Sequence, residues 1–235
     1  MKALTREQEH RFFQTVAWML AGLVFLGFAR TYYLKSFFGA PALPLLLHAH
    51  GIVMTLWFGL FIVQVALVKS RRVDLHRRLG SAGLLLGAGA AILSAVISFG
   101  LARQELLTVP ASRLPALLFG LQLFAVLGVF VILMLLGYRY RRRPDIHKRL
   151  MTMGMLCVLG PALTRLPFLP NHNVGVTIAF NVGLILAVVL TDTILCRRLH
   201  PAFAGGAALV IGSMFTVAQF AQTDFWVGWV RRTLL

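Results

Sequence analysis

Charged residues are scarce in this sequence, and acidic ones especially so. Asp and Glu number 7 against 23 Lys and Arg in 235 residues, and charged residues make up 13% of the chain, compared with roughly 25% in a soluble domain. The two cysteines, Cys157 and Cys196, form no CxxC pair, so no disulfide framework is predicted. No GxSxG, Walker A or HExxH motif is present, which leaves hydrolytic, phosphoryl-transfer and HExxH zinc enzymes without support.

Apolar residues take the place of the missing charges. They make up 59% of the chain, and the mean hydropathy is +0.82. A bilayer core needs roughly 20 mostly apolar residues per helix, and the sequence offers about seven such stretches with short connections. The predicted fold class is therefore all-α, an integral membrane helical bundle that forms a single domain over residues 1–235. The predicted spans are 12–29, 45–68, 79–101, 114–137, 150–169, 174–195 and 203–220.

Basic residues are unevenly divided between the two sides that seven spans define. The side that carries the N-terminus holds 16 of the 23 Lys and Arg residues. Short cytoplasmic loops are rich in Lys and Arg, so we expect a cytoplasmic N-terminus and a periplasmic C-terminus in a bacterial inner membrane. Concentrated basic loops predict contact with anionic lipid headgroups. They account for the net charge of +16 without nucleic acid as a partner.

One charged sequence occurs twice. RRVDLHRRLG at 71–80 returns as RRPDIHKRLM at 142–151, and the same offset aligns LP at 43–44 with LP at 114–115. Each copy, about 43–101 and about 114–169, is predicted to contain a helix, a basic loop and a second helix. An even number of spans separates the copies, so the hairpins of spans two and three and of spans four and five are predicted to form a parallel repeat.

The repeat places His76 and His147 at equivalent positions. Asp74 and Asp145 are predicted to be N-caps, which puts both histidines in the first turn of a helix. Helix N-termini with additional cations favour anions, so one hypothesis is that these loops hold lipid phosphates. The other hypothesis is that His76 and His147 face each other and share a ligand.

His48 and His50 have no counterpart in the repeat. Side chains two residues apart on a helix differ by about 200° in direction, so only one of the two can point into the bundle. His50, Trp57 and Gln64 follow at heptad spacing and predict one inward stripe. Ionisable residues at membrane depth are costly, which makes them candidates for function. The alternative is a hydrogen-bonded structural histidine near the interface.

Arg165 lies deep in the fifth predicted span, toward the end where His48 and His50 are expected. A long basic side chain near a helix end can snorkel to the interface. It can also pair with an anionic ligand, such as a propionate of haem. His172, in the following loop, is predicted to have access to the same side.

Asp192 and His200 lie near the cytoplasmic end of the sixth predicted span. With His76 and His147 they would form a site of three histidines and one carboxylate for a divalent metal. The alternative is that Asp192 pairs with a neighbouring arginine, as buried carboxylates in membranes commonly do.

Several segments together resemble a group of uncharacterised bacterial multi-span membrane proteins, over about residues 30–202. They are the stretch containing LLLHAHGIVMTLWFGLFIVQ and HRRLG, then RRRPDIHKRLM, TRLP and TDTILCRRLHPA. The group implies a membrane bundle but no activity. The order of the histidine, glutamine and HRxLG elements is also distantly similar to membrane cytochromes of the b561 kind, which implies haem b held by histidines of facing helices. His48 and His50 depart from that pattern because they have no partner in the fourth span.

Two functional classes follow. The first is a redox or cofactor-handling membrane protein that binds haem b or a divalent metal through histidines at span ends, because haem iron accepts histidine ligands. His48, His50, Gln64, His76, His147, Arg165, Asp192 and His200 are its candidate residues. The second is a non-enzymatic carrier of a small or lipid-like molecule, or an accessory subunit that contacts another membrane protein or a second copy of itself.

Overall fold

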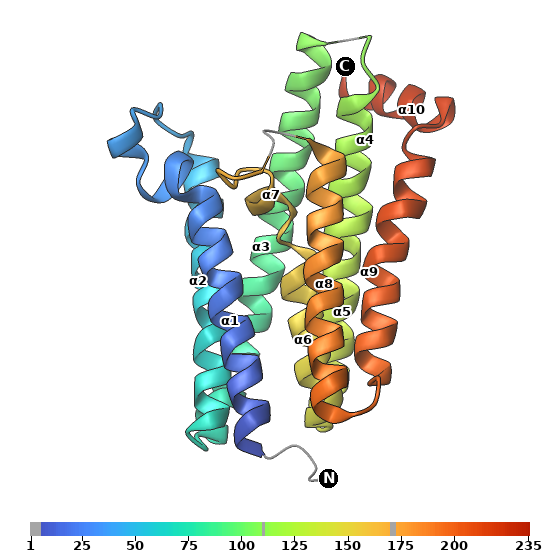
Figure 1. Cartoon of the computed structure of the whole chain (residues 1–235). Coiled ribbons are helices and arrows are strands. Elements are labelled where there is room, and N and C mark those ends of the chain that lie inside the picture. Colours follow the sequence, from blue (N-terminus) through green and yellow to red (C-terminus); the bar gives the residue numbers. More distant parts are fainter. Residues whose placement is uncertain (1–5, 110, 170–172) are drawn as a thin grey trace.

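The structure, a computed structural model, describes residues 6–109, 111–169 and 173–235, and every regular element within these ranges is a helix. The helices run side by side as one bundle (Figure 1). Six helical stretches in the described ranges are long and apolar enough to cross a membrane. The prediction of an all-α, multi-pass membrane protein is therefore confirmed at this level.

The first half of the bundle is built from long helices. α1 (Arg6–Phe28) continues into a π-helix, η1 (Ala29–Tyr33), and a short 3-10 helix, η2 (Lys35–Phe38). α2 (Leu45–Lys69) returns along α1, and α3 (Val73–Thr108) runs back beside α2. α3 begins at Val73 and α6 at Pro144, so Asp74 and Asp145 lie in the first turn and are not the predicted N-caps.

The second half contains two irregular helices. The fourth span runs from α4 (Leu114–Gly120) through a π-helical stretch, η3 (Leu121–Gly128), to α5 (Val129–Arg139). The next segment was predicted to be one span over 150–169. The structure instead shows α6 (Pro144–Cys157), a break, and the single turn α7 (Gly160–Leu163).

Pro161 explains this break. Proline has no N–H to donate to the carbonyl of Cys157, and its ring clashes with that carbonyl in a continuous helix. The equivalent position in the first copy of the repeat is Ala90, in the unbroken α3. The second helix of the hairpin is therefore continuous in the first copy and broken in the second. The count of seven spans and the parallel repeat remain predictions.

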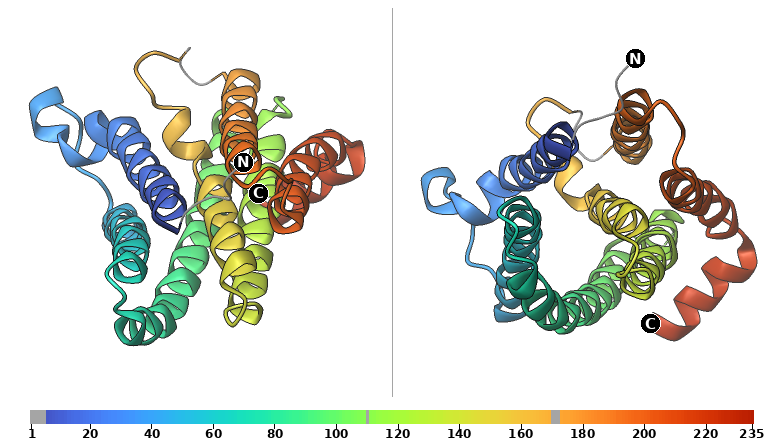
Figure 2. Two further views of the ribbon diagram at one scale, coloured as in Figure 1. Left: turned by 60° about the horizontal axis from the view of Figure 1, so that its bottom comes forward. Right: turned by 90° about the horizontal axis from the view of Figure 1, so that it is seen from below.

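The remaining helices complete the bundle. α8 (Val174–Cys196) and α9 (Pro201–Phe220) run antiparallel, and α10 (Asp224–Leu234) lies across the end of the bundle opposite to the start of α1 (Figures 1 and 2). α10 was not predicted. Its buried face, formed by Trp226, Val227 and Val230, packs on α3 and α4.

Large apolar side chains cover the outside of the bundle. Leu85 is 79% exposed, Ile92 63% and Ile194 66%, on helices whose inner faces are buried. In a water-soluble protein contiguous apolar surface of this kind is rare, whereas in a bilayer it faces lipid tails. The exposed surface therefore agrees with the membrane assignment.

Candidate functional site

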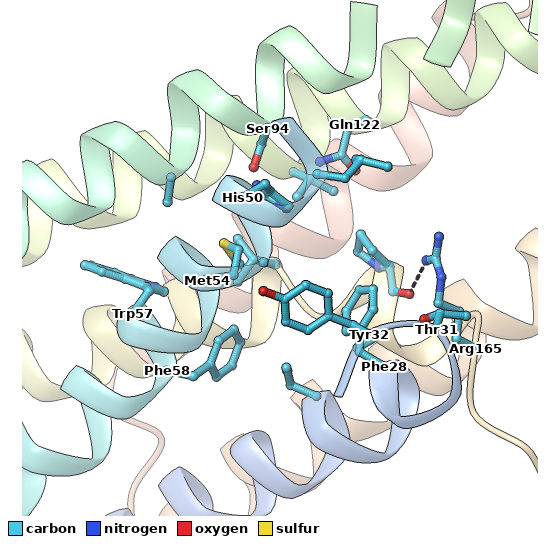
Figure 3. Close-up of a pocket in the computed structure, with 18 of the residues that line it drawn as sticks. Phe28, Thr31, Tyr32, His50, Met54, Trp57, Phe58, Ser94, Gln122 and Arg165 are labelled. Carbon is cyan, nitrogen blue, oxygen red and sulfur yellow. Dashed lines mark hydrogen bonds between the residues drawn. The ribbon is translucent and has the colours of Figure 1, made fainter. Parts of the chain in front are cut away.

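The largest structural irregularities of the bundle meet around one cavity of about 250 Å³. It lies between α2, α3, η3, the end of α1 with η1, and the break between α6 and α7 (Figure 3). η1 and η3 are π-helical, and π-helical turns occur often at functional sites. This cavity is the candidate site.

α2 supplies one wall through residues three and four positions apart. His50, Met54, Trp57 and Phe58 point from this helix into the cavity (Figure 3). Trp57 is 5% exposed, and its ring packs edge to face on Phe130 with centroids 5.6 Å apart. The part of the predicted stripe formed by His50 and Trp57 thus lines the cavity.

Gly87 of α3 makes room for the Trp57 indole. A Cβ atom at this glycine would lie 3.0 Å from the Trp57 ring, closer than side chains normally approach. Because Gly87 has no side chain, the Trp57 ring can pack closely against α3. This contact helps to hold the indole, with its Nε1 atom, in place.

His48 takes a different direction from His50, as the helical spacing predicted. It is not among the cavity-lining residues; its ring packs against the Tyr32 ring, with centroids 5.6 Å apart. The Tyr32 hydroxyl donates a hydrogen bond to the His48 carbonyl at 3.3 Å. His48 therefore holds η1 against α2, and His50 is the cavity histidine.

Two polar atoms of this wall lack a partner. His50 Nδ1 and Trp57 Nε1 are buried and make no hydrogen bond to any residue that the structure describes. Buried polar groups are nearly always hydrogen-bonded, and exceptions call for an explanation. Among the described residues, the Asn181 amide and Arg231 Nε are also buried without a partner, but they do not line the cavity, whereas His50 Nδ1 and Trp57 Nε1 belong to residues of one cavity wall.

Other walls of the cavity carry further polar groups, one on regular helix and one on π-helical backbone. Ser94 of α3 and Gln122 of η3 are half-buried and line the cavity (Figure 3). Behind them the Cys157 thiol donates to the carbonyls of Ala125 and Val126 at 3.5 Å each. The end of α6 is thereby tied to the π-helical stretch of η3.

Arg165 reaches the cavity from the segment after α7, on the side where the sequence predicted it. Its Nη1 donates to the Pro161 carbonyl at 2.6 Å, and its guanidinium lies over the Phe28 ring, 5.1 Å from the centroid. Arg165 thus lines the cavity while its side chain is hydrogen-bonded to α7, the helical turn that precedes it. The described lining residues include no Asp or Glu.

A second group of predicted residues meets at the basic end of the bundle. The rings of His76 and His147 lie 6.1 Å apart between centroids at an interplanar angle of 87°. With the Gln64 amide oriented to satisfy its neighbours, its nitrogen donates to His76 Nδ1, and its oxygen accepts from the Gly80 N–H at 3.0 Å. His147 Nδ1 bonds to the Gly137 carbonyl at 2.8 Å. Nδ1 of both rings is thus hydrogen-bonded, and no hydrogen bond joins Nε2 of either ring to another residue within the described part of the chain.

Asp192 belongs to a separate ion pair. Arg149 Nε donates to Asp192 Oδ2 at 2.9 Å and Nη2 to Oδ1 at 2.8 Å, and both side chains are at most 3% exposed. The bidentate geometry is the strong form of this interaction. The alternative prediction, that Asp192 pairs with an arginine, is the one that the structure shows.

His200 is the N-cap of α9. Its Nδ1 accepts from the Ala202 N–H at 3.1 Å, and its Nε2 lies 3.4 Å from Asp145 Oδ2. Burial lowers the pKa of His200, and the nearby Arg149 cation lowers it further, against the opposing effect of Asp145 and Asp192.

The predicted metal site of three histidines and a carboxylate is not assembled. Within the described ranges no three or more His, Cys, Asp or Glu side chains come together in a group able to hold a metal ion. His172 lies outside the described residues. Comparison of the chain with models of known protein families gives no match, and comparisons with curated proteins and with solved structures give none either.

Proposed function

We propose that this multi-pass membrane protein binds a small, largely apolar molecule in the cavity between α2, α3, η3 and the α6–α7 break, as a carrier or receptor. One observation carries the proposal. His50 Nδ1 and Trp57 Nε1 are buried in the wall of the cavity and have no partner among the described residues.

The energetic argument concerns desolvation. A buried polar group without a hydrogen bond costs about 1–3 kcal/mol, and two such groups share this wall. A ligand that offers hydrogen-bonding atoms at both positions removes this cost when it binds. Most of the other lining residues are apolar or aromatic, as in small-molecule sites generally, where a few polar groups fix the orientation.

The charges around the cavity restrict the class of ligand. The described lining residues include Arg165 but no carboxylate, so a bound cation would meet a like charge and no anionic partner. The volume of about 250 Å³ lies below the usual range of roughly 300–1,000 Å³ for drug-sized ligands. The ligand is therefore small, or places only its head group in the cavity, and it is neutral or anionic.

The test is to identify what the protein retains. We expect solvent extracts of detergent-purified protein, analysed by mass spectrometry, to contain one class of neutral or anionic small molecule at near-stoichiometric amounts. Trp57→Phe, which keeps the ring and removes the N–H, should lower its occupancy severalfold. Trp18→Phe is the control because Trp18 is 59% exposed and does not line this cavity. Equal occupancy in all three proteins would contradict the proposal.

A second candidate function, binding of haem b or a metal, is favoured by the pair of His76 and His147. Metal-bound histidines commonly donate their other ring N–H to an acceptor, as His147 Nδ1 can to the Gly137 carbonyl. For His76 to do the same, the Gln64 amide has to turn its oxygen toward Nδ1 in place of its nitrogen. Because a metal–nitrogen bond is about 2 Å, rings 6.1 Å apart between centroids can bind one ion between them. Visible spectra before and after dithionite, with metal analysis, test this. A colourless, metal-free protein from cells supplied with iron and haem precursor would reject it.

We also propose that α6, α7 and the following coil complete a seventh crossing, with the N-terminus in the cytoplasm of a bacterial inner membrane. The support is that 16 of the 23 basic residues belong to the loops on that side. Anionic lipid headgroups are the partners expected there. Reporter fusions at the two termini would give opposite locations, and equal locations would contradict the seven-crossing topology.

A further inference from the structure

The two unpartnered atoms of the cavity wall are spaced along a single helix. His50 and Trp57 are seven residues apart on α2, and at a rise of 1.5 Å per residue this separates their positions by roughly 10 Å. Seven residues also return to nearly the same helical face, within about 20°. Both side chains therefore enter the cavity from one wall (Figure 3).

The hydrogen-bonding character of these two atoms restricts the ligand that can satisfy them. Trp57 Nε1–H can only donate. His50 Nδ1 has no described protein partner that would fix its tautomer, and it donates when it carries the ring proton. With the ring proton on His50 Nδ1 both atoms donate, and a ligand that satisfies both then has two hydrogen-bond acceptors.

A ring with opposed carbonyls has two acceptors that face away from each other. Two carbonyl oxygens on opposite corners of a six-membered ring lie roughly 5 Å apart, because each C=O bond adds about 1.2 Å to the width of the ring. Such a ring can accept one hydrogen bond from each of two donors that stand at separate positions along α2.

The remaining walls suit a flat, uncharged ring. Met54, Phe58 and Phe130 line the space around the two nitrogen atoms, and aromatic rings pack well against such surfaces. At the margin, the half-buried Leu43 and Leu47 line the cavity beside Leu45, which is 85% exposed. An apolar tail attached to the ring can therefore leave along an apolar edge.

We propose that the cavity binds the head group of a lipid-soluble quinone. One carbonyl oxygen accepts from Trp57 Nε1–H, the opposed one accepts from His50 Nδ1–H, and the ring lies among the aromatic side chains. The proposal rests on the proposed function, since it names the ligand class of the same cavity.

The test compares two probes on the purified protein in detergent. Decylubiquinone carries the opposed carbonyls, and decylbenzene has the same tail on a ring without them. We expect saturable binding of decylubiquinone by calorimetry, at least tenfold tighter than that of decylbenzene. Trp57→Phe and His50→Leu should each weaken quinone binding roughly five- to tenfold, the value of one neutral hydrogen bond, and Trp18→Phe should not change it.

The outcomes separate the two proposals. Equal affinity for both probes in the unaltered protein would overturn the quinone assignment while leaving a small-molecule cavity, and it needs no variant to fold. Binding of neither probe would also overturn the quinone assignment, and the extraction experiment then decides the proposed function by itself. An unchanged quinone affinity in a folded Trp57→Phe protein would overturn the role of Trp57.

Discussion

The rings of His76 and His147 meet edge to face with centroids 6.1 Å apart, although 71 residues separate them in the sequence. The two copies of the repeated motif hold their histidines by different means. His76 Nδ1 accepts from the amide of Gln64, whereas His147 Nδ1 is bonded to a main-chain carbonyl, that of Gly137. Since a carbonyl only accepts and the Gln64 nitrogen only donates, the two rings carry opposite tautomers.

Opposite tautomers give a direct prediction. We expect nitrogen-15 NMR spectra of histidine-labelled protein near neutral pH to show His76 with its proton on Nε2 and His147 with its proton on Nδ1. Gln64→Leu should release His76 and leave His147 held, and it should cost about 1–3 kcal/mol in stability, because the amide bonds to His76 Nδ1, the His76 carbonyl and the Gly80 N–H and each hydrogen bond contributes roughly 1 kcal/mol. The same tautomer on both rings would show that the Gln64 amide has the reverse orientation.

The buried ion pair of Arg149 and Asp192 predicts a large effect on stability. Asp192→Ala leaves the 3% exposed Arg149 without its bidentate partner, with only Glu9 at 3.9 Å as a carboxylate neighbour. Loss of one partner of a buried pair costs about 3–5 kcal/mol. Thermal unfolding in detergent should show a clearly lower Tm.

Two matched variants define this ion-pair effect. The exposed pair of Arg11 and Glu7, with both side chains 70% exposed, should contribute less than about 1 kcal/mol when Arg11 is replaced by Ala. The double variant Arg149→Met with Asp192→Leu removes both charges and should recover most of the lost stability. A double variant as unstable as Asp192→Ala would indicate that packing, not the unpaired charge, causes the loss.

His200 makes stability depend on pH. Its pKa is lowered in the folded protein by burial, then by Arg149, so the unfolded chain binds a proton more readily than the folded one. The stabilisation is complete above the unfolded pKa of about 6.5 and declines as the pH falls below it. Protonation at Nδ1 also removes the acceptor for the Ala202 N–H.

The measurement is the Tm of the unaltered protein and of His200→Asn between about pH 8 and pH 5. Asparagine is a good N-cap but does not titrate in this range. We expect the difference in Tm between the two proteins to shift in favour of the variant as the pH falls. Parallel curves would exclude His200 as the source.

The contact between α1 and α7 predicts a sharp difference between two glycines. A Cβ atom at Gly27 would collide with the backbone of Ala162, whereas one at Gly22 would meet nothing within 4 Å. Gly27→Ala should therefore destabilise the protein by about 1–3 kcal/mol through overpacking. Gly22→Ala should be neutral or slightly stabilising because alanine favours a helix. Equal Tm values for the two variants would contradict this packing.

The sequence predicted most of the helices because long apolar runs require little context. Helical spacing also indicated that only one of His48 and His50 would face inward, and the heptad spacing of His50 with Trp57 and Gln64 offered His50 as a candidate. It did not yield α10, whose alternation of Trp, Val and Arg is too short and too polar for a span. The break near Pro161 was missed although glycine and proline are adjacent there, because the apolar run continues through them.

The polar lining of the cavity was only partly predictable. His50 and Arg165 are ionisable residues in apolar runs and were singled out for that reason. Ser94 and Gln122 were not, since an uncharged polar residue in a span is common, and only the fold places them opposite α2. Asp192 had two alternatives, a metal ligand or the partner of an arginine. The sequence alone does not show which side chains lie next to it in the fold.

The interruption at Pro161 gives the interior of the bundle main-chain hydrogen-bond acceptors that a continuous helix lacks. A continuous helix offers the hydrocarbon interior no free acceptor, whereas the interrupted one leaves the Cys157 carbonyl without its usual donor and gives the Pro161 carbonyl to Arg165. Such acceptors remain when any side chain other than that of Pro161 is replaced. Pro161→Ala restores an N–H, and it is the substitution that can return a donor to the Cys157 carbonyl.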